Sequence, residues 1–206
     1  MKSRIYLEDL ESEGKISTQD SNLVRSAIKK GSLFFVVGQS GSGKSVVSRI
    51  LANEIAKETK RLVNVYLDDL ELKYADKLVH NGFLKDEGVI WKEHDELKSE
   101  NWDFTQHSVM IDEVWKGITK SGWLLARCQN IENIILSNQL HRTTSKIIND
   151  NQALEIIIES FNIEPDIDYQ DILSWLRDRG TVFIYLSNNK EKIFSPQLYF
   201  LTEKID

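Results

Sequence analysis

The feature that most constrains this chain is an eight-residue segment, GQSGSGKS, at residues 38–45. A continuous apolar run, LFFVV, comes directly before it, and apolar residues then recur at three- and four-residue steps over residues 44–60. The run is typical of a strand buried on both faces of a parallel sheet, and the later spacing predicts a helix with one buried face. The glycine-rich segment therefore joins a buried strand to a helix, as in an α/β sheet.

This segment fits the pattern G-x-x-x-x-G-K-[ST], which lets backbone N–H groups wrap around phosphate oxygens. The helix that follows adds the partial positive charge of its N-terminus. We expect Lys44 to reach the β- and γ-phosphates of a nucleoside triphosphate, and the Ser45 hydroxyl to ligate Mg²⁺. The residues predicted to surround the phosphates are Gly38, Gln39, Ser40, Gly41, Ser42, Gly43, Lys44, Ser45 and Val46.

A second apolar run, SVMI at residues 108–111, ends in Asp112 and Glu113. Two carboxylates at the end of a buried strand, downstream of a phosphate-binding loop, form the pattern called Walker B. We expect Asp112 to hold the Mg²⁺ shell and Glu113 to polarise the attacking water. The adjacent acidic pair favours a hydrolase over a kinase, because a kinase must keep water away from that position.

A further predicted strand, NIIL at residues 133–136, continues into Ser137, Asn138 and Gln139. A polar side chain at the tip of a central strand can contact the γ-phosphate or the attacking water. We therefore assign Gln139 as a candidate sensor of the γ-phosphate.

Strand and helix patterns alternate along the rest of the chain, which predicts a mostly parallel sheet covered on both faces. We expect residues 1–31 to be an N-terminal helical extension and residues 32–206 to be one nucleotide-binding domain. The remaining predicted helices cover residues 21–30, 93–100, 122–128 and 168–177. The remaining predicted strands cover residues 61–69, 89–91 and 154–158, and a C-terminal β-hairpin covers residues 181–200.

The composition of the chain limits where in the cell the protein is expected and which partners it is expected to bind. The net charge of −6 argues against a protein that coats nucleic acid with its whole surface, although a few basic loops could still grip phosphates. The one cysteine, Cys128, permits no internal disulfide, and no apolar run is long enough to cross a membrane. The first residues lack the pattern of a signal peptide, so we expect a cytoplasmic protein.

Taken together, these motifs resemble those of the FtsK/HerA superfamily of ring-shaped DNA-translocating ATPases. The likeness lies in GSGKSV at residues 41–46, in the strand-terminal pairs Asp68-Asp69 and Asp112-Glu113, and in the order helix, strand, glutamine of LLARCQNIENIILSNQ. The likeness is greatest to the small genome-packaging ATPases of tailless icosahedral viruses with an internal membrane. It covers roughly residues 33–196, and it is partial where Leu140 follows the glutamine in place of Arg-Pro.

The resemblance implies a three-layer, RecA/FtsK-like P-loop NTPase that uses ATP and Mg²⁺ to move double-stranded DNA into a preformed capsid. It implies a homo-oligomeric ring, a pentamer or a hexamer, in the host cytoplasm or on the virion, with capsid vertex or membrane proteins as further partners. It also implies an arginine that reaches the neighbouring subunit's nucleotide, for which Arg127 is the candidate and Arg142 its competitor. The basic, aromatic segment at residues 115–123 is the candidate DNA contact.

Two other functions fit the same motifs. A small-molecule phosphotransferase could use a carboxylate at the end of residues 61–69 to accept a proton from a substrate hydroxyl. A non-translocating assembly or secretion ATPase would share the nucleotide site and lack the DNA contacts. Both alternatives remain open at the level of sequence.

Overall fold

The structure of the protein is a computed structural model. It describes residues 6–67, 88–93, 107–111, 131–139, 149–161, 169–186 and 196–201. Its described strands form one seven-stranded sheet in the order β3-β2-β4-β5-β1-β6-β7. All neighbouring strands are parallel except β6 and β7, which are antiparallel. The strands are β1 (Leu33–Gly38), β2 (Leu62–Leu67), β3 (Val89–Glu93), β4 (His107–Ile111), β5 (Ile134–Gln139), β6 (Val182–Leu186) and β7 (Pro196–Phe200).

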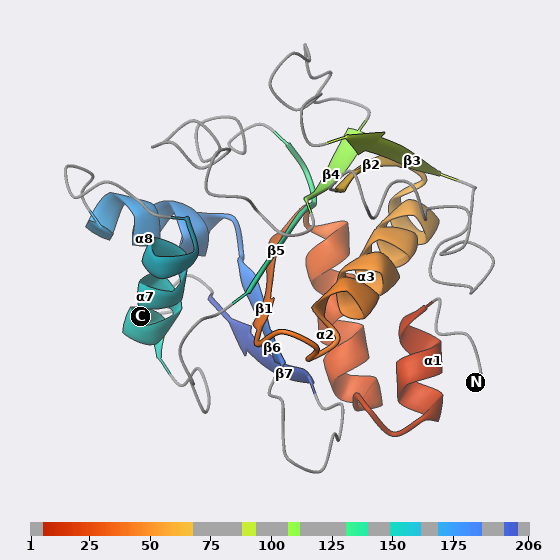
Figure 1. Ribbon diagram of the computed structural model, residues 1–206, viewed down its shortest axis with the longest axis horizontal. Coiled ribbons are helices and arrows are strands. Elements are labelled where there is room, and N and C mark those ends of the chain that lie inside the picture. The colour runs from red at the N-terminus through yellow and green to blue at the C-terminus, as the bar shows by residue number, and fades with distance from the viewer. Residues whose placement is uncertain are drawn as a thin grey trace.

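Helices cover both faces of this sheet, so the molecule has three layers (Figure 1). The helices on one face are α1 (Leu7–Ser12), α2 (Thr18–Lys29) and α3 (Lys44–Thr59), and those on the other are α7 (Asp150–Phe161) and α8 (Tyr169–Asp178). The predicted mostly parallel α/β architecture is therefore confirmed.

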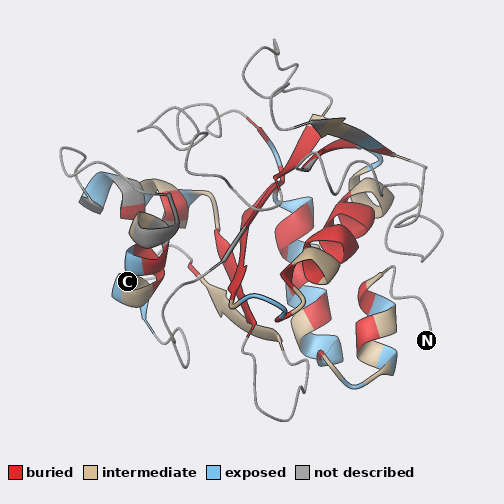
Figure 2. Cartoon of the chain, viewed as in Figure 1, coloured by how far each residue is buried: buried red, intermediate tan, exposed pale blue. Residues whose placement is uncertain are grey.

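Alternation along β1 divides the core into two hydrophobic clusters. Phe34 and Val36 pack with the helices α1 to α3, whereas Leu33, Phe35 and Val37 pack with α7 and α8. All five side chains are fully buried, and Figure 2 shows the central strands as the most buried part of the molecule. Because β1 is buried on both faces of the sheet, all of these positions are apolar, and this explains the uninterrupted apolar run in the sequence.

The prediction of a strand at residues 154–158 is wrong, because these residues belong to helix α7. The Asn149 side chain accepts a hydrogen bond from the Gln152 amide at 3.0 Å and so caps the first turn. Ala153 and Ile156, three residues apart, are fully buried on one side of the helix. The cap and this packing outweigh the preference of three consecutive isoleucines for extended backbone.

The predicted C-terminal hairpin is confirmed, since β6 and β7 pair from Val182 opposite Phe200 to Leu186 opposite Pro196. Gly180, at a φ of 61°, ends the preceding helix as predicted. The turn predicted at residues 187–190 lies outside the described residues. No helix in the described part of the chain is long and apolar enough to cross a membrane.

The two N-terminal helices share a hydrophobic cluster with α3, the helix that follows the glycine-rich loop. Leu10 of α1 and Ile28 of α2 are 1% exposed, and they belong to the same cluster as Leu51 and Ile55 of α3. The division of the chain at residue 31 remains a prediction. In the structure, the segment before it is packed against the helix that carries the candidate site.

Candidate nucleotide-binding site

The glycine-rich loop leaves the end of β1 and turns into α3. The Ser42 amide donates to the Gln39 carbonyl at 3.2 Å, which closes a turn at the tip of the loop. Gly41 and Gly43 have φ angles of 74° and 95°, and Gly43 is the N-cap of α3. These left-handed conformations suit glycine and explain its presence at both positions.

Gly38, the first glycine of the loop, is required by close packing. A Cβ atom placed on it would lie 2.4 Å from the Leu186 carbonyl oxygen and 2.7 Å from the Ser42 Oγ. Leu186 is the residue opposite Gly38 in the pairing of β1 with β6. The loop therefore begins against the end of β6, a neighbour that sequence reasoning did not identify.

Lys44 is the first residue of α3, and it is only 6% exposed. Its ammonium group donates a hydrogen bond to the Gln39 carbonyl at 3.1 Å, so the side chain folds back over the loop. The cation is thus held on the loop side, where successive backbone N–H groups begin the helix. The role of Lys44 as a phosphate ligand remains a prediction.

The N-terminus of α3 supplies the rest of an anion site. Lys44, Ser45 and Val46 form the first turn, whose amides have no acceptors within the helix. These amides and the helix dipole favour a phosphate group at this end. Ser42 also contributes a buried hydroxyl, which has no hydrogen-bond partner in the part of the chain that the structure describes.

A hydroxyl ligand and nearby phosphate oxygens suit Mg²⁺, which binds through few protein groups and keeps several waters. Ser45, half-buried in the first turn of α3, is in a position to supply that hydroxyl. The residues present therefore fit a magnesium–nucleotide complex. Asp112, the second predicted metal ligand, lies outside the described residues.

The backbone of the predicted sensor Gln139 lies directly beside the loop. In the pairing of β1 with β5, Gln139 is opposite Gly38, the first residue of the loop. Strand β5 separates β1 from β4, which carries the Walker B sequence and whose Ile111 is opposite Leu136 of β5. The carboxyl ends of all three strands therefore meet at one edge of the sheet.

The other predicted residues are not placed. Glu113, Arg127 and Arg142 lie outside the described residues, as do Asp68 and Asp69. The helix predicted at residues 93–100 also lies outside them, apart from Glu93, which ends β3. The helix predicted at residues 122–128 and the basic segment at residues 115–123 lie outside them entirely. Their assigned roles remain predictions.

Charged side chains connect the N-terminal helices to α3, a feature that sequence reasoning missed. The Glu54 carboxylate of α3 is fully buried, and it accepts hydrogen bonds from Arg25 Nε at 3.0 Å and from the Leu7 amide at 3.2 Å. Burial lowers the pKa of Arg25, but the hydrogen bond and charge of Glu54 outweigh this effect, so the pKa is raised. A glutamate at an otherwise apolar face of the predicted helix was the signal available in the sequence.

Comparison with protein families gives a partial match. A model of the Zeta toxin family matches residues 16–75, less than a third of the chain, in a segment that includes the glycine-rich loop. No characterised protein sequence matches the chain closely enough to be counted as a relative.

The chain is similar in structure to the VirB11 ATPase of the Brucella suis type IV secretion system, solved with sulphate, at a TM-score of 0.58 and 14% identity. The match covers 94% of this chain and 56% of that one, so the chain spans little more than half of that protein's length. The match to the flagellar accessory protein FlaH of Methanocaldococcus jannaschii covers 75% of this chain and 70% of that one, at 15% identity. The match to the DnaC helicase loader covers 82% of this chain and 88% of that one, at 12% identity. Their TM-scores of 0.40 and 0.41 are too low to support a detailed comparison.

These observations establish the fold. The parallel sheet, its two helical layers and the likeness to VirB11 are those of a P-loop NTPase.

Proposed function

We propose that this chain hydrolyses ATP at the loop of residues 38–45 and uses the energy to move double-stranded DNA. The observation that carries the hydrolytic part is the pairing of Gln139 with Gly38. This register brings an amide-bearing residue to the first residue of the phosphate loop, at the strand edge where β4 also ends. A glutamine there can contact the γ-phosphate or orient water, as glutamines do in several nucleotide hydrolases.

The roles of the binding groups follow from their positions on α3. The amides of the first turn and the Lys44 ammonium would bind the β- and γ-phosphates, and they would stabilise the negative charge that develops during cleavage. The Ser45 hydroxyl and the Asp112 carboxylate would hold the magnesium ion. The positive charge that they would hold there would neutralise part of the negative charge of the phosphates. Glu113 would then accept a proton from the attacking water.

The DNA-translocating part of the proposal is supported by the motif order shared with FtsK/HerA ATPases. We propose a homo-oligomeric ring, a pentamer or a hexamer, that moves duplex DNA into a viral capsid. In such a ring Arg127 would stabilise the charge on the neighbouring subunit's nucleotide. The ring, the DNA and the capsid or membrane partners belong to the proposal.

The test is phosphate release from ATP by the purified chain, with and without duplex DNA, followed by displacement of a third strand from a triplex. We expect duplex DNA to stimulate phosphate release severalfold and the third strand to be displaced in an ATP-dependent manner. Lys44→Ala, which removes the phosphate-binding cation, should abolish both. Hydrolysis without stimulation or displacement would contradict the motor and would favour the assembly or secretion ATPase.

A phosphotransferase would give another result. Such an enzyme would form ADP only when a small hydroxyl-bearing acceptor is present, because it excludes water from the γ-phosphate. ADP formation that depends on an acceptor would therefore overturn the proposed hydrolysis.

A further inference from the structure

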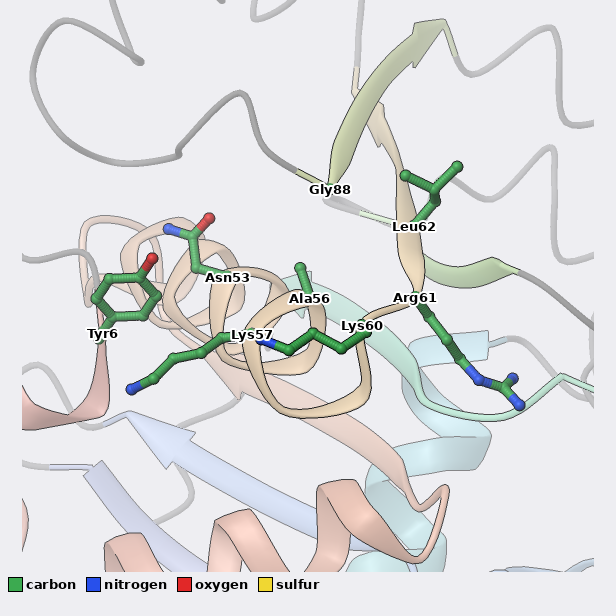
Figure 3. Close-up of a pocket in the computed structure, with 8 residues that line it drawn as sticks. All are labelled: Tyr6, Asn53, Ala56, Lys57, Lys60, Arg61, Leu62 and Gly88. Atoms are coloured by element: carbon green, nitrogen blue, oxygen red, sulfur yellow. The ribbon is translucent and has the colours of Figure 1, made fainter.

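A second pocket lies at the opposite end of α3 from the phosphate loop. Helix α3 has 16 residues, so its ends are about 24 Å apart. The pocket is bounded by the last two turns of α3, by Tyr6 before α1, and by the chain just before β2 and β3 (Figure 3). Its volume of about 300 Å³ is at the lower end of the range for small-molecule sites.

The polar groups of this pocket are suited to an anion. Among the described residues that line it, Lys57, Lys60 and Arg61 are basic and none is acidic. Figure 3 shows the side chain of Lys60 directed back along α3, toward Lys57. Arg61 is directed away from these groups and pairs with Glu132 at 2.7 Å. Lys60 therefore supplies positive charge at the α3 side of the pocket. The Lys57 ammonium lies at the Tyr6 end, where it is also 3.6 Å from a Glu54 carboxylate oxygen.

Lys57 is held in place by its surroundings. Its ammonium nitrogen lies 2.7 Å from a Glu8 carboxylate oxygen and 4.8 Å from the centre of the Tyr6 ring. Burial lowers the pKa of Lys57, but the hydrogen bond to Glu8 and the charges of Glu54 and Glu8 outweigh it, so the pKa is raised. An ammonium group has three donors, so this fixed and charged group can bind an anion while it remains paired with Glu8.

Lys60 occupies a position where a side chain is unfavourable. It is the C-cap of α3, with a φ of 59°, and this left-handed conformation usually carries glycine. Lysines at a helix C-terminus complement the dipole, but a lysine earlier in the last turn would do so without strain. A strained residue that places its charge over a pocket indicates a binding role.

We propose that this pocket is an anion site, separate from the phosphate loop, that binds a small phosphate-bearing molecule. Lys57 and Lys60 would make charge-assisted hydrogen bonds to the phosphate group. Asn53 and Tyr6 would border the remainder of the ligand. The site would bind whether or not the phosphate loop hydrolyses ATP.

The experiment is a titration of the ¹⁵N-labelled full chain with inorganic phosphate, followed by amide NMR. We expect saturable shifts at Asn53, Lys57 and Gly88, in wild type and in the Lys44→Ala variant. Shifts at residues 41–46 alone would overturn the second site and leave the phosphate loop intact. Shifts at the pocket alone would support the second site and count against phosphate binding at the loop.

Lys60→Gly separates binding from folding. It removes the charge and places glycine where the backbone favours it, so we expect a higher melting temperature together with phosphate affinity at the pocket lowered about tenfold. Lys15→Ala, at the other end of α1 from Tyr6, is the control and should leave the affinity unchanged. Unaltered affinity in Lys60→Gly would refute the proposal. A short DNA duplex that shifts the same amides at lower concentration than inorganic phosphate would overturn the small-molecule assignment.

Discussion

The sharpest consequence of the structure concerns Gly38. An alanine Cβ there would lie 2.4 Å from the Leu186 carbonyl oxygen, about 1 Å closer than an ordinary contact, and 2.7 Å from the Ser42 Oγ. The Ser42 side chain can rotate, but the Leu186 carbonyl belongs to the backbone of β6. Either β6 or the start of the loop must therefore move in Gly38→Ala.

The size of the effect follows from this displacement. Forcing one extra carbon into a packed site costs about 1–3 kcal/mol, and the contact with backbone favours the upper part of that range. For a chain of 206 residues, this corresponds to a melting temperature lowered by roughly 5–10 °C. A displacement of the loop by about 1 Å can also lower the rate of ATP turnover about a hundredfold, because the reacting groups no longer align.

The assay compares Gly38→Ala with Gly14→Ala by thermal unfolding and by ATP turnover. Gly14 has a φ of 66°, and among the described residues other than its chain neighbours no atom lies within 4 Å of the position its Cβ would take. Its substitution should cost about 1 kcal/mol from backbone strain and leave turnover unchanged. If Gly38→Ala retained the wild-type melting temperature and turnover, the close packing of the loop against β6 would be refuted.

Four further predictions test other parts of the account. Glu113→Gln should bind ATP and hydrolyse it at least a hundredfold more slowly, as measured by phosphate release; full activity would remove its role. Arg127→Ala should assemble and bind ATP without hydrolysis, whereas unchanged turnover would exclude it. Arg25→Ala leaves the buried Glu54 carboxylate poorly compensated and should cost about 3 kcal/mol in urea unfolding. The control Lys29→Ala should cost less than about 1 kcal/mol, because the Lys29 side chain, which pairs with Glu58, is exposed. Burial and the hydrogen bond to Asp150 raise the pKa of Tyr199 from 10.0 to about 12. The contribution of Tyr199 to stability is therefore complete below pH 10 and is lost as the pH rises toward 12. Tyr199→Phe should flatten this alkaline loss of stability, and an unchanged profile of stability against pH would contradict the prediction.

Local patterns predicted much of the fold. The strand β1, the loop and the helix α3 follow from a continuous apolar run, three glycines and an apolar repeat, each set by nearby residues. The hairpin of β6 and β7 was predicted for the same reason. Helix α7 was not, because the β-branched run at residues 156–158 resembles a strand, while the cap at Asn149 and burial against the sheet determine the structure.

Contacts between distant segments were beyond the reach of sequence patterns. The pairing of Gly38 with Gln139 joins residues a hundred positions apart, and no local periodicity specifies which parallel strand lies beside which. The order of strands places the Gln139 backbone beside the loop, and the sensor role of its side chain remains a prediction. The link from Glu54 to Arg25 and the approach of Leu186 to the loop are likewise products of the tertiary fold.

The fate of the γ-phosphate tests the central claim most directly. The purified chain should convert γ-labelled ATP to labelled inorganic phosphate in the presence of Mg²⁺, and Lys44→Ala should not. Label that remains in ATP under all conditions, with and without duplex DNA, or that passes only to an organic acceptor, would contradict the account.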